Sequence, residues 1–522
     1  MTKYLLKRLL HGAVSVVIVV GIVMVMIYSM LDRNLIFAND STYTHQSNNN
    51  RISYTYATWE TYGYVDYVPY SDYLQELIKN GELSEEEYSA VSSVGSTADK
   101  DSEETARYIA QFTQYYESQG YQVRRYDAVI RSGKVADGGR AILFAYRNIP
   151  VMKRMLSYFT NLLDVDNIHD IDTVEGEPGL TFTLYDPVYG GEKFSPAVIG
   201  NGTTHKYLIY FDNRFPYFHQ NLLTLNLGMS YAVNAGVDVF TTMTQAQGSY
   251  VNSVITYPTG LTESSADDLH TATYSQGSRE SSLVYETRYD DDYTVVQLVR
   301  GGKSRMGYSF VIGIIEIILA YLIGLPVGIL MARKKDKLVD KLGTAYVVFI
   351  MAVPSLSYIF IFKAIGGKLG LPTTFDLDRT TKLMYILPIA SLAATSIAGL
   401  MKWMRRYMID QMNSDYVKFA RSGGLSEGEI FNKHIMKNAI IPLVHSIPAD
   451  VIYAMTGAMI TERVYSVPGA GRMLIEAINK YDNTVIVGMV LFYAVLSVVA
   501  LALGDCAMAL VDPRISFDTK AR

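Results

Sequence analysis

Apolar residues in this chain gather into six long runs, and one long polar stretch separates the first run from the others. Residues 9–31 form the first run, which is long enough to cross the ~30 Å hydrocarbon core of a bilayer. The other five are each near the ~20 residues that a transmembrane helix requires, and they cover residues 306–332, 344–365, 383–404, 439–461 and 484–510. The pattern predicts a polytopic α-helical membrane protein with six transmembrane helices.

Basic residues predict the orientation of these helices. Lys3, Lys7 and Arg8 precede the first run, which is too long for a signal peptide and lacks a small-residue cleavage site. Lysine and arginine are also concentrated in alternate loops, which the positive-inside rule assigns to the cytoplasm. We therefore expect both termini in the cytoplasm. The segments are residues 1–31 (N-terminus and first helix), 32–305 (extracellular), 306–512 (membrane core) and 513–522 (cytoplasmic tail).

The polar stretch, residues 32–305, has the pattern of an α+β domain inserted between the first two membrane helices. It holds about two-thirds of the 41 tyrosines, which suit partly wet, amphipathic surfaces. Strand-like alternation occurs at residues 140–146, 180–185, 207–211, 250–257 and 293–299, and helical periodicity at 72–79 and 104–119. Residues 79–104 and 259–282 are rich in small polar or acidic residues and predict flexible surface.

Composition and motifs exclude several classes of function. The net charge of −5 argues against nucleic-acid binding, and the single cysteine, Cys506, excludes a disulfide framework and a cysteine metal site. Gly302-Lys303-Ser304 resembles the end of a phosphate-binding loop, but Gln297 stands where its first glycine is required. The alternating aspartates from Asp164 to Asp172 lack the glycine of a calcium loop. With no nucleophile–base constellation either, we expect no catalytic residue, cofactor or metal.

Residues 414–442 predict two short helices joined by a hinge, on the cytoplasmic side between the fourth and fifth membrane helices. The first helix, around 415–422, should end at Gly423 or Gly424, because glycine tolerates the left-handed conformation that closes a helix. Ser426 and Glu429 form a capping box for the second helix, and Leu425 and Ile430 occupy the positions of a hydrophobic staple. The local signals fit a docking element or an ordinary helical hairpin equally well.

Polar residues inside the apolar runs are candidates for lining a path through the membrane, because a charged group at bilayer depth costs several kcal/mol unless it is sheltered. Asp450 is favoured for a cavity-lining role over a buried helix–helix contact, and for Glu316 the two interpretations are about equal. The polar candidates in these runs are Glu316, Thr395, Ser396, His445, Asp450 and Thr456. Pro442 and Pro448 predict a bend in the fifth membrane helix.

With this topology, the chain resembles a known family. Asp415-Tyr416-Val417, Ala420-Arg421, Gly424-Leu425-Ser426, His434, Lys437-Asn438-Ala439 and Pro442 are similar to the cytoplasmic coupling loop (the EAA loop) of ABC-type importer permeases in their dipeptide/oligopeptide version. Thr461-Glu462-Arg463-Val464-Tyr465 and Pro468-Gly469-Ala470-Gly471-Arg472 are similar to the signature that follows it. Ser422-Gly423 departs from the common Ala-Lys of that loop. The large extracellular insertion resembles the oligopeptide permeases of low-GC Gram-positive bacteria.

The resemblance implies an ABC type I importer fold and a transmembrane subunit of an ATP-driven oligopeptide importer, which forms half of the pore and is itself no enzyme. Its implied partners are a second permease subunit, two ABC ATPase subunits, an extracellular substrate-binding lipoprotein and oligopeptides, in the plasma membrane of a Gram-positive bacterium. Loop 414–438 would couple to the ATPases through Ala420, Arg421, Gly424, Leu425, Ser426, Glu429, His434 and Asn438, and Glu462 joins the candidates for the translocation pathway. The alternative is a membrane sensor or scaffold whose ectodomain binds peptide or a receptor protein without transport.

Overall fold

The computed structural model describes residues 2–171, 176–186, 192–211, 218–256, 262–264, 270, 298–377, 381–454 and 458–511. Its contacts divide the chain into two compact units, Gly21–Asn161 and Met1–Val20 with Leu162–Arg522. The boundary at Asn161 falls inside the predicted insertion, residues 32–305. Most of the predicted flexible segment 259–282 lies outside the described residues, as do residues 293–297 of one predicted strand.

The unit Gly21–Asn161 has an antiparallel sheet with strand β5 (Ile142–Asn148) between β1 (Val65–Pro69) and β2 (Gln122–Tyr126). The predicted strand at 140–146 and the predicted helices at 72–79 and 104–119 are confirmed as β5, α4 and α6. The remaining elements of this unit are η1 (Arg33–Phe37), α2 (Ser41–His45), α3 (Asn48–Thr61), α4 (Tyr70–Lys79), α5 (Glu85–Val91), η2 (Ala98–Lys100), α6 (Glu103–Ser118), β3 (Ile130–Arg131), β4 (Lys134–Val135) and α7 (Val151–Thr160).

Alternate residues of β5 build two cores, one on each face of this sheet. Leu143 and Ala145 pack into a cluster with Leu74 of α4 and Phe112 of α6. Phe144 and Tyr146 point the other way, because successive strand side chains face opposite sides, and join a cluster that includes Trp59 of α3. Tyrosines are prominent in both clusters, so many of them are core residues rather than the wet surface expected from composition.

The prediction that residues 79–104 form flexible surface is wrong. Helix α5 begins with a capping box, in which the side chain of Ser84 accepts from the backbone N–H of Glu87 and the Glu87 side chain accepts from the N–H of Ser84. Leu83 and Val91 on either side of this start are buried in the cluster of α4 and α6. The Ser-x-x-Glu signal was present in the sequence, but the acidic and serine-rich composition around it outweighed it.

In the other unit, residues 162–304 form small antiparallel sheets. The predicted strands at 180–185 and 207–211 are confirmed as β7 and β9 of a four-stranded sheet with the order β10-β9-β8-β7, and the run 250–257 contains two short strands. The elements are β6 (Leu163–Val165), β7 (Gly179–Thr183), β8 (Ala197–Asn201), β9 (Tyr207–Tyr210), β10 (His219–Gln220), β11 (Leu223–Leu225), α8 (Val239–Thr244), β12 (Tyr250–Asn252), β13 (Ile255–Thr256), β14 (Thr262–Glu263) and β15 (Leu298–Arg300).

A buried carboxylate fastens part of this region to the membrane helices. Asp482 is fully buried in the turn between α19 (Ala470–Asn479) and α20 (Asn483–Val511). One of its oxygens accepts from the hydroxyl of Ser230 at 2.7 Å. The same oxygen lies 2.9–3.0 Å from the backbone nitrogens of three consecutive residues, Tyr231, Ala232 and Val233. Successive N–H groups that converge on one oxygen form an anion-binding nest, so this contact holds residues 230–233 against the start of α20.

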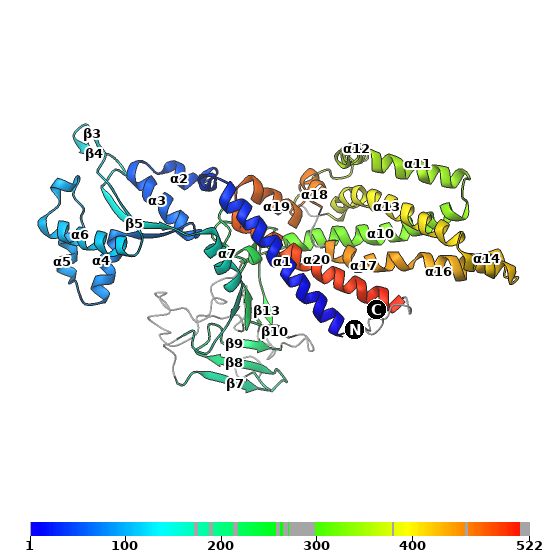
Figure 1. The fold of residues 1–522 in the computed structure, drawn as a ribbon, viewed down its shortest axis with the longest axis horizontal. Coiled ribbons are helices and arrows are strands. Elements are labelled where there is room, and N and C mark those ends of the chain that lie inside the picture. Colours follow the sequence, from blue (N-terminus) through cyan, green and yellow to red (C-terminus); the bar gives the residue numbers. More distant parts are fainter. Residues whose placement is uncertain are drawn as a thin grey trace. The chain divides into compact units, whose positions relative to one another are not determined.

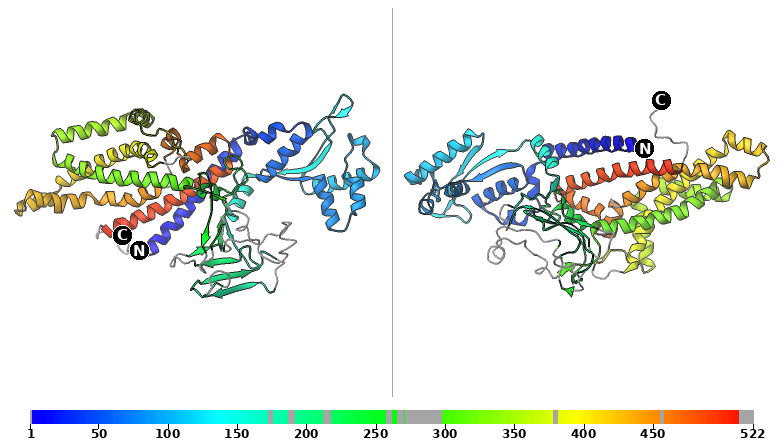
Figure 2. Two further views of the ribbon diagram at one scale, coloured as in Figure 1. Left: turned by 180° about the vertical axis from the view of Figure 1, so that it is seen from behind. Right: turned by 90° about the horizontal axis from the view of Figure 1, so that it is seen from below.

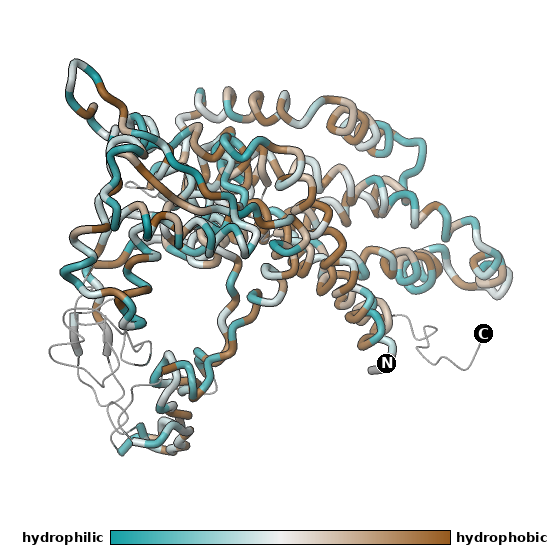
Figure 3. The backbone as a smooth tube through the Cα atoms, turned by 60° about the vertical axis from the view of Figure 1, so that its left-hand side comes forward, coloured by the Kyte–Doolittle hydropathy of each residue, from teal (hydrophilic) through white to brown (hydrophobic). Residues whose placement is uncertain are grey.

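Four helices of the described chain are long and apolar enough to cross a membrane, and the number rises to six if each of two bent pairs counts as one span. The four are α1 (Thr2–Met30), α10 (Arg305–Arg333), α13 (Ile386–Met412) with the short η5 (Lys382–Tyr385) before it, and α20. In Figure 3, hydrophobic residues are prominent along the helix that begins at the N-terminus. Ser304, from the apparent phosphate-binding motif, is the N-cap of α10, where its hydroxyl oxygen accepts from the N–H of Gly307.

The first bent pair differs from the single helix expected at residues 344–365. Helices α11 (Leu338–Ala352) and α12 (Ser355–Lys368) meet at 109° around Pro354, because proline disfavours helical backbone at the residue before it. The second pair joins Glu427–Ala439 to α17 (Ile441–Tyr453) at 43°, with Pro442 in the first turn of α17 as predicted. Pro448, the other predicted bend, lies inside α17 and does not end it. The later part of the run 439–461 forms a separate helix, α18 (Met459–Tyr465).

Ion pairs and glycines join the membrane helices to one another. The first half of α1 runs beside α20 (Figures 1 and 2), where Arg8 pairs with Asp505 and the hydroxyl of Tyr4 donates to the same carboxylate at 2.9 Å. Gly324 and Gly328 let α10 approach α13 so closely that an added Cβ at either would lie 2.9 Å from a side chain of α13.

Phe112→Ala should destabilise the Gly21–Asn161 unit by about 3–5 kcal/mol, because the ring is fully buried between α4, α6 and β5. Limited proteolysis of the full chain would then cut α6 faster. Tyr115→Ala removes a half-exposed ring from the same helix and is the control. Equal protease resistance of the two variants would contradict the assignment of Phe112 to the core.

Candidate functional site

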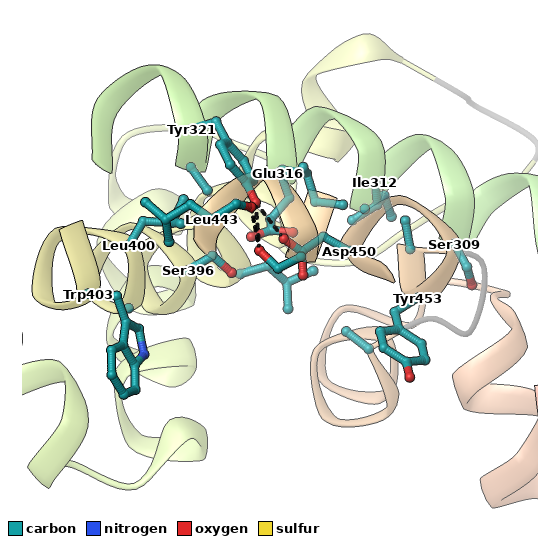
Figure 4. Close-up of a pocket in the computed structure, with 18 of the residues that line it drawn as sticks. Ser309, Ile312, Glu316, Tyr321, Ser396, Leu400, Trp403, Leu443, Asp450 and Tyr453 are labelled. Carbon is teal, nitrogen blue, oxygen red and sulfur yellow. Dashed lines mark hydrogen bonds between the residues drawn. The ribbon is translucent and has the colours of Figure 1, made fainter. Parts of the chain in front are cut away.

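Side chains of α10, α13, α17 and α18 enclose a cavity of about 420 Å³ (Figure 4). Glu316, Ser396, Asp450 and Glu462, four of the predicted pathway residues, line it. The lining also includes residues that sequence reasoning missed, among them Tyr321, Trp403, Ser446 and Tyr453. The fold thus brings together polar groups from parts of the sequence more than a hundred residues apart.

Asp450 is hydrogen-bonded across the cavity wall. The hydroxyl of Tyr321 on α10 donates to its carboxylate at 2.8 Å and lies 3.2 Å from the hydroxyl of Ser446 on α17 (Figure 4). Ser446 in turn donates to the carbonyl of Leu443, one turn earlier in α17. Tyr321 therefore links α10 to α17 through the acid. A tyrosine and a serine within apolar runs were the available signals for this link, since both carry polar tips that need partners at membrane depth.

Glu316 is only 8% exposed, yet its Oε1 atom has no hydrogen-bond partner among the described residues. A buried polar atom without a partner forfeits the hydrogen bonds that water supplied, which costs about 1–3 kcal/mol and more for a charged group. Glu316 stands out from the other acids of the cavity for this reason.

Glu462 lines the cavity, but its carboxylate is occupied within the subunit. It accepts hydrogen bonds from the hydroxyl of Ser309 on α10 at 2.6 Å and from the backbone N–H groups of Ala458 and Arg472 at 3.2 and 2.9 Å. The turn before α19 passes so close that a Cβ at Gly469 would lie 2.4 Å from this carboxylate. The geometry gives Glu462 a structural role, as the residue that fixes α18, α19 and α10 together.

Two of the other three predicted pathway residues, Thr395 and His445, are not among the described residues that line the cavity. The hydroxyl of Thr395 lies 2.5 Å from that of Tyr358, in the contact between α12 and α13. His445 lies beside Gly504 of α20, and its buried Nδ1 atom has no partner among the described residues. Thr456 lies outside the described residues.

The predicted helix pair is present as α14 (Asp415–Ser422) and α15 (Glu427–Glu429). Gly423 caps α14, and Gly424 takes the left-handed φ of +83°. The capping box is confirmed, since Ser426 accepts from the N–H of Glu429 and the Glu429 side chain accepts from the N–H of Ser426. The hydrophobic staple between Leu425 and Ile430 stays a prediction.

A π-helical segment, η6 (Ile430–Ile435), follows α15 and leads into α16 (Met436–Ala439). Local capping signals gave no indication of it, because a π-helix closes each hydrogen bond one residue later than an α-helix and has no cap of its own. Short π segments of this kind occur frequently at functional sites.

One face of this helix assembly is anchored in the bundle. Val417 of α14, Ile430 of η6 and Ala439 of α16 are buried in one cluster with Met404 and Met408 of α13. Of the predicted coupling residues, Ala420 is buried on the same side, His434 and Asn438 are half-buried, and Arg421, Gly424, Leu425, Ser426 and Glu429 are exposed. The hinge is therefore fixed from within and free on its outer side.

Two features of the outer side were not expected. Arg421 spans the hinge to pair with Glu427 at 2.5 Å, so its charge is compensated within the element rather than offered to a partner. Phe419, one turn before the hinge, is 79% exposed, the largest value for any aromatic residue described. Single exposed apolar side chains are common on protein surfaces, and this ring lies next to the hinge of the helix pair.

Apolar helices around a cavity that contains three acids, with an anchored helix pair beside them, are the arrangement expected of a transport permease. Residues 324–517 match the family of binding-protein-dependent transport system inner membrane components. The chain is 34% identical to the oligopeptide transport system permease protein AmiC of Streptococcus pneumoniae, over 100% of this chain and 99% of AmiC. The dipeptide permease protein DppB and the oligopeptide permease protein AppB of Bacillus subtilis are 31% and 30% identical, each over 41% of this chain and over 68% and 71% of their own lengths.

The chain therefore belongs to the permeases of binding-protein-dependent ABC transporters, and it has their type I importer fold. It is a transport component and not an enzyme.

Gly469→Ala should destabilise the protein by about 1–3 kcal/mol, because the new methyl group would collide with the Glu462 carboxylate. The thermal unfolding temperature of the detergent-solubilised protein would fall. Gly179→Ala is the control, since a Cβ at that position meets no atom within 4 Å. An unchanged unfolding temperature for Gly469→Ala would show that the close approach is absent.

Proposed function

We propose that this chain is the transmembrane subunit of an ATP-driven oligopeptide importer and forms half of its translocation pore, with a second permease subunit supplying the other half. The observation that carries the proposal is the extent of the match to AmiC. DppB and AppB match 41% of this chain, whereas AmiC matches all of it, so the long insertion is common to this chain and an oligopeptide permease protein.

The proposed membrane topology has six spans, which are the four long helices, the bent pair α11–α12 and the run that begins with α17, and it leaves residues 414–438 and both termini in the cytoplasm. Contacts between the two ends of the membrane domain support it. Tyr4 and Arg8 at the start of α1 bind Asp505 near the end of α20, so these two helix ends lie on the same side of any membrane that both helices cross. The basic residues before α1 favour the cytoplasm for that side, and residues 32–305 would then be extracellular.

Helices α14 and α15 are the proposed handle for the ATPase subunits. Their inner side is packed on α13, so a force applied to the exposed hinge would pass into a helix that lines the cavity. Arg421 and Glu427 brace the hinge, and Phe419 offers an apolar contact. ATP-driven closure of the partner ATPases would thereby tilt α13 and α17 and change access to the cavity.

The insertion has a proposed role in docking the substrate-binding lipoprotein that delivers peptide. Many of its tyrosines lie in the two cores around β5, which supports a stable folded platform rather than a wholly open peptide-gripping surface. The setting would be the plasma membrane of a Gram-positive bacterium.

Gly424→Ala should reduce peptide uptake severalfold, because a non-glycine residue at φ +83° costs about 1–2 kcal/mol and the hinge would relax away from its docking shape. Uptake of labelled peptide by cells that contain all subunits measures the effect. Gly428→Ala, at an open helical position four residues later, is the matched control. Equal uptake by the two variants would refute a role for the hinge conformation.

Phe419→Ala should weaken co-purification of the ATPase subunits and lower uptake, while the variant itself remains folded because the ring is exposed. Removal of an aromatic anchor from the centre of an interface typically costs about 2 kcal/mol or more in binding. Met152→Ala removes an exposed apolar side chain on α7 and should change neither measurement. ATPase binding at the wild-type level would place the dock elsewhere.

A further inference from the structure

In the part of the chain that the structure describes, acidic side chains line the cavity between α10, α13 and α17 without basic side chains to balance their charge. Three carboxylic acids line it, Glu316, Asp450 and Glu462, whereas no lysine, arginine or histidine is among its described lining residues. The carboxylate of Glu462 already accepts hydrogen bonds from the Ser309 hydroxyl and from backbone N–H groups. The carboxylate of Asp450 accepts a hydrogen bond from the hydroxyl of Tyr321. Neither arrangement supplies a positive charge.

Glu316 is the acid of this cavity with a carboxylate oxygen that lacks a hydrogen-bond donor among the described residues. It is more than nine-tenths buried, it faces the cavity, and its Oε1 atom accepts no hydrogen bond from the described residues. The Glu316 side chain has a hydrogen-bond contact with Ser396, which carries no positive charge. Ionisable groups inside a membrane domain mark ligand or ion pathways by default.

We propose that Glu316 and Asp450 bind an ammonium group of the transported molecule as it crosses the membrane. This inference rests on the proposed function and names the part of a peptide that the cavity recognises. An ammonium group has three donors and one positive charge, so it can satisfy the free oxygen of Glu316 and the carboxylate of Asp450 together. The α-amino terminus of a peptide and a lysine side chain share this chemistry.

The remaining walls suit such a ligand. Tyr321 points toward the two acids, whereas Trp403 and Tyr453 line opposite ends of the cavity (Figure 4). The volume of about 420 Å³ lies within the ~300–1,000 Å³ typical of small-ligand sites, so it admits more than a bare ion. The described residues contain no cluster of three acidic or metal-binding side chains arranged to hold a metal ion.

The test measures uptake of matched peptides by the complete importer, with wild-type chain or with Glu316→Gln. One pair of peptides differs only in the α-amino group, which is present or replaced by hydrogen. The second pair differs only in lysine or norleucine at one internal position. The receptor lipoprotein selects peptides too, but it is the same in both strains, so the ratio of variant to wild-type uptake for each peptide reports on the permease.

We expect Glu316→Gln to lower uptake of the ammonium-bearing member of one pair by about tenfold or more, the usual effect of losing a hydrogen bond to a charged group. The member without the ammonium should change less than about threefold. The pair that responds identifies the source of the group. Asp450→Asn should show the same preference, and it carries the test if Glu316→Gln fails to assemble. Asp410→Asn, on α13 but outside this cavity and paired with Arg406 at 3.9 Å, is the control for loss of an acid.

Equal losses for both members of both pairs, or no loss for any peptide, would overturn ammonium recognition while leaving peptide import intact. If the wild-type importer takes up neither member of either pair, the proposed function itself is wrong, and the inference fails with it.

Discussion

A buried acidic group must find hydrogen-bond donors, and this requirement organises much of the permease. Asp482 accepts hydrogen bonds from a serine hydroxyl and three backbone N–H groups. Glu462 accepts them from a hydroxyl and two backbone N–H groups. Asp505 forms an ion pair with Arg8 and accepts a hydrogen bond from Tyr4. Each of these acids joins segments that are far apart in the sequence. Where water is scarce, such contacts strengthen because the alternative for the acid is an uncompensated charge.

The same requirement separates structural acids from the acids that fit transport. Glu462 resembles a pathway residue by position, but its oxygens are already used, and the glycines beside it leave room for nothing larger. Glu316 is also buried and lines the same cavity without a full set of partners. The distinction depends on which side chains surround each carboxylate. Two acids in two apolar runs therefore look equivalent until the helices are packed.

Local signals predicted the local structure of the coupling element well. Gly423, Gly424, Ser426 and Glu429 defined the hinge and its cap, because caps depend on only a few adjacent residues. The π-helical segment η6 and the pairing of Arg421 with Glu427 were not predictable in this way, since both depend on how the second helix is fitted against α13.

Longer elements were predicted by their apolar periodicity, and the errors fell where a single residue overrides that pattern. The run 344–365 is mostly apolar, yet Pro354 turns the chain by 109° within it. In the insertion, composition concealed α5, although two buried residues and a capping box define it. The cavity required three or more helices to be placed in space, and a list of polar residues identified only part of its lining.

The nest around Asp482 has a consequence for how such a permease can change over evolutionary time. Because residues 230–233 are fastened directly to the start of α20, these contacts do not depend on how many residues separate them from α1. Insertions or deletions in the loops before residue 230 can therefore accumulate without loss of this attachment.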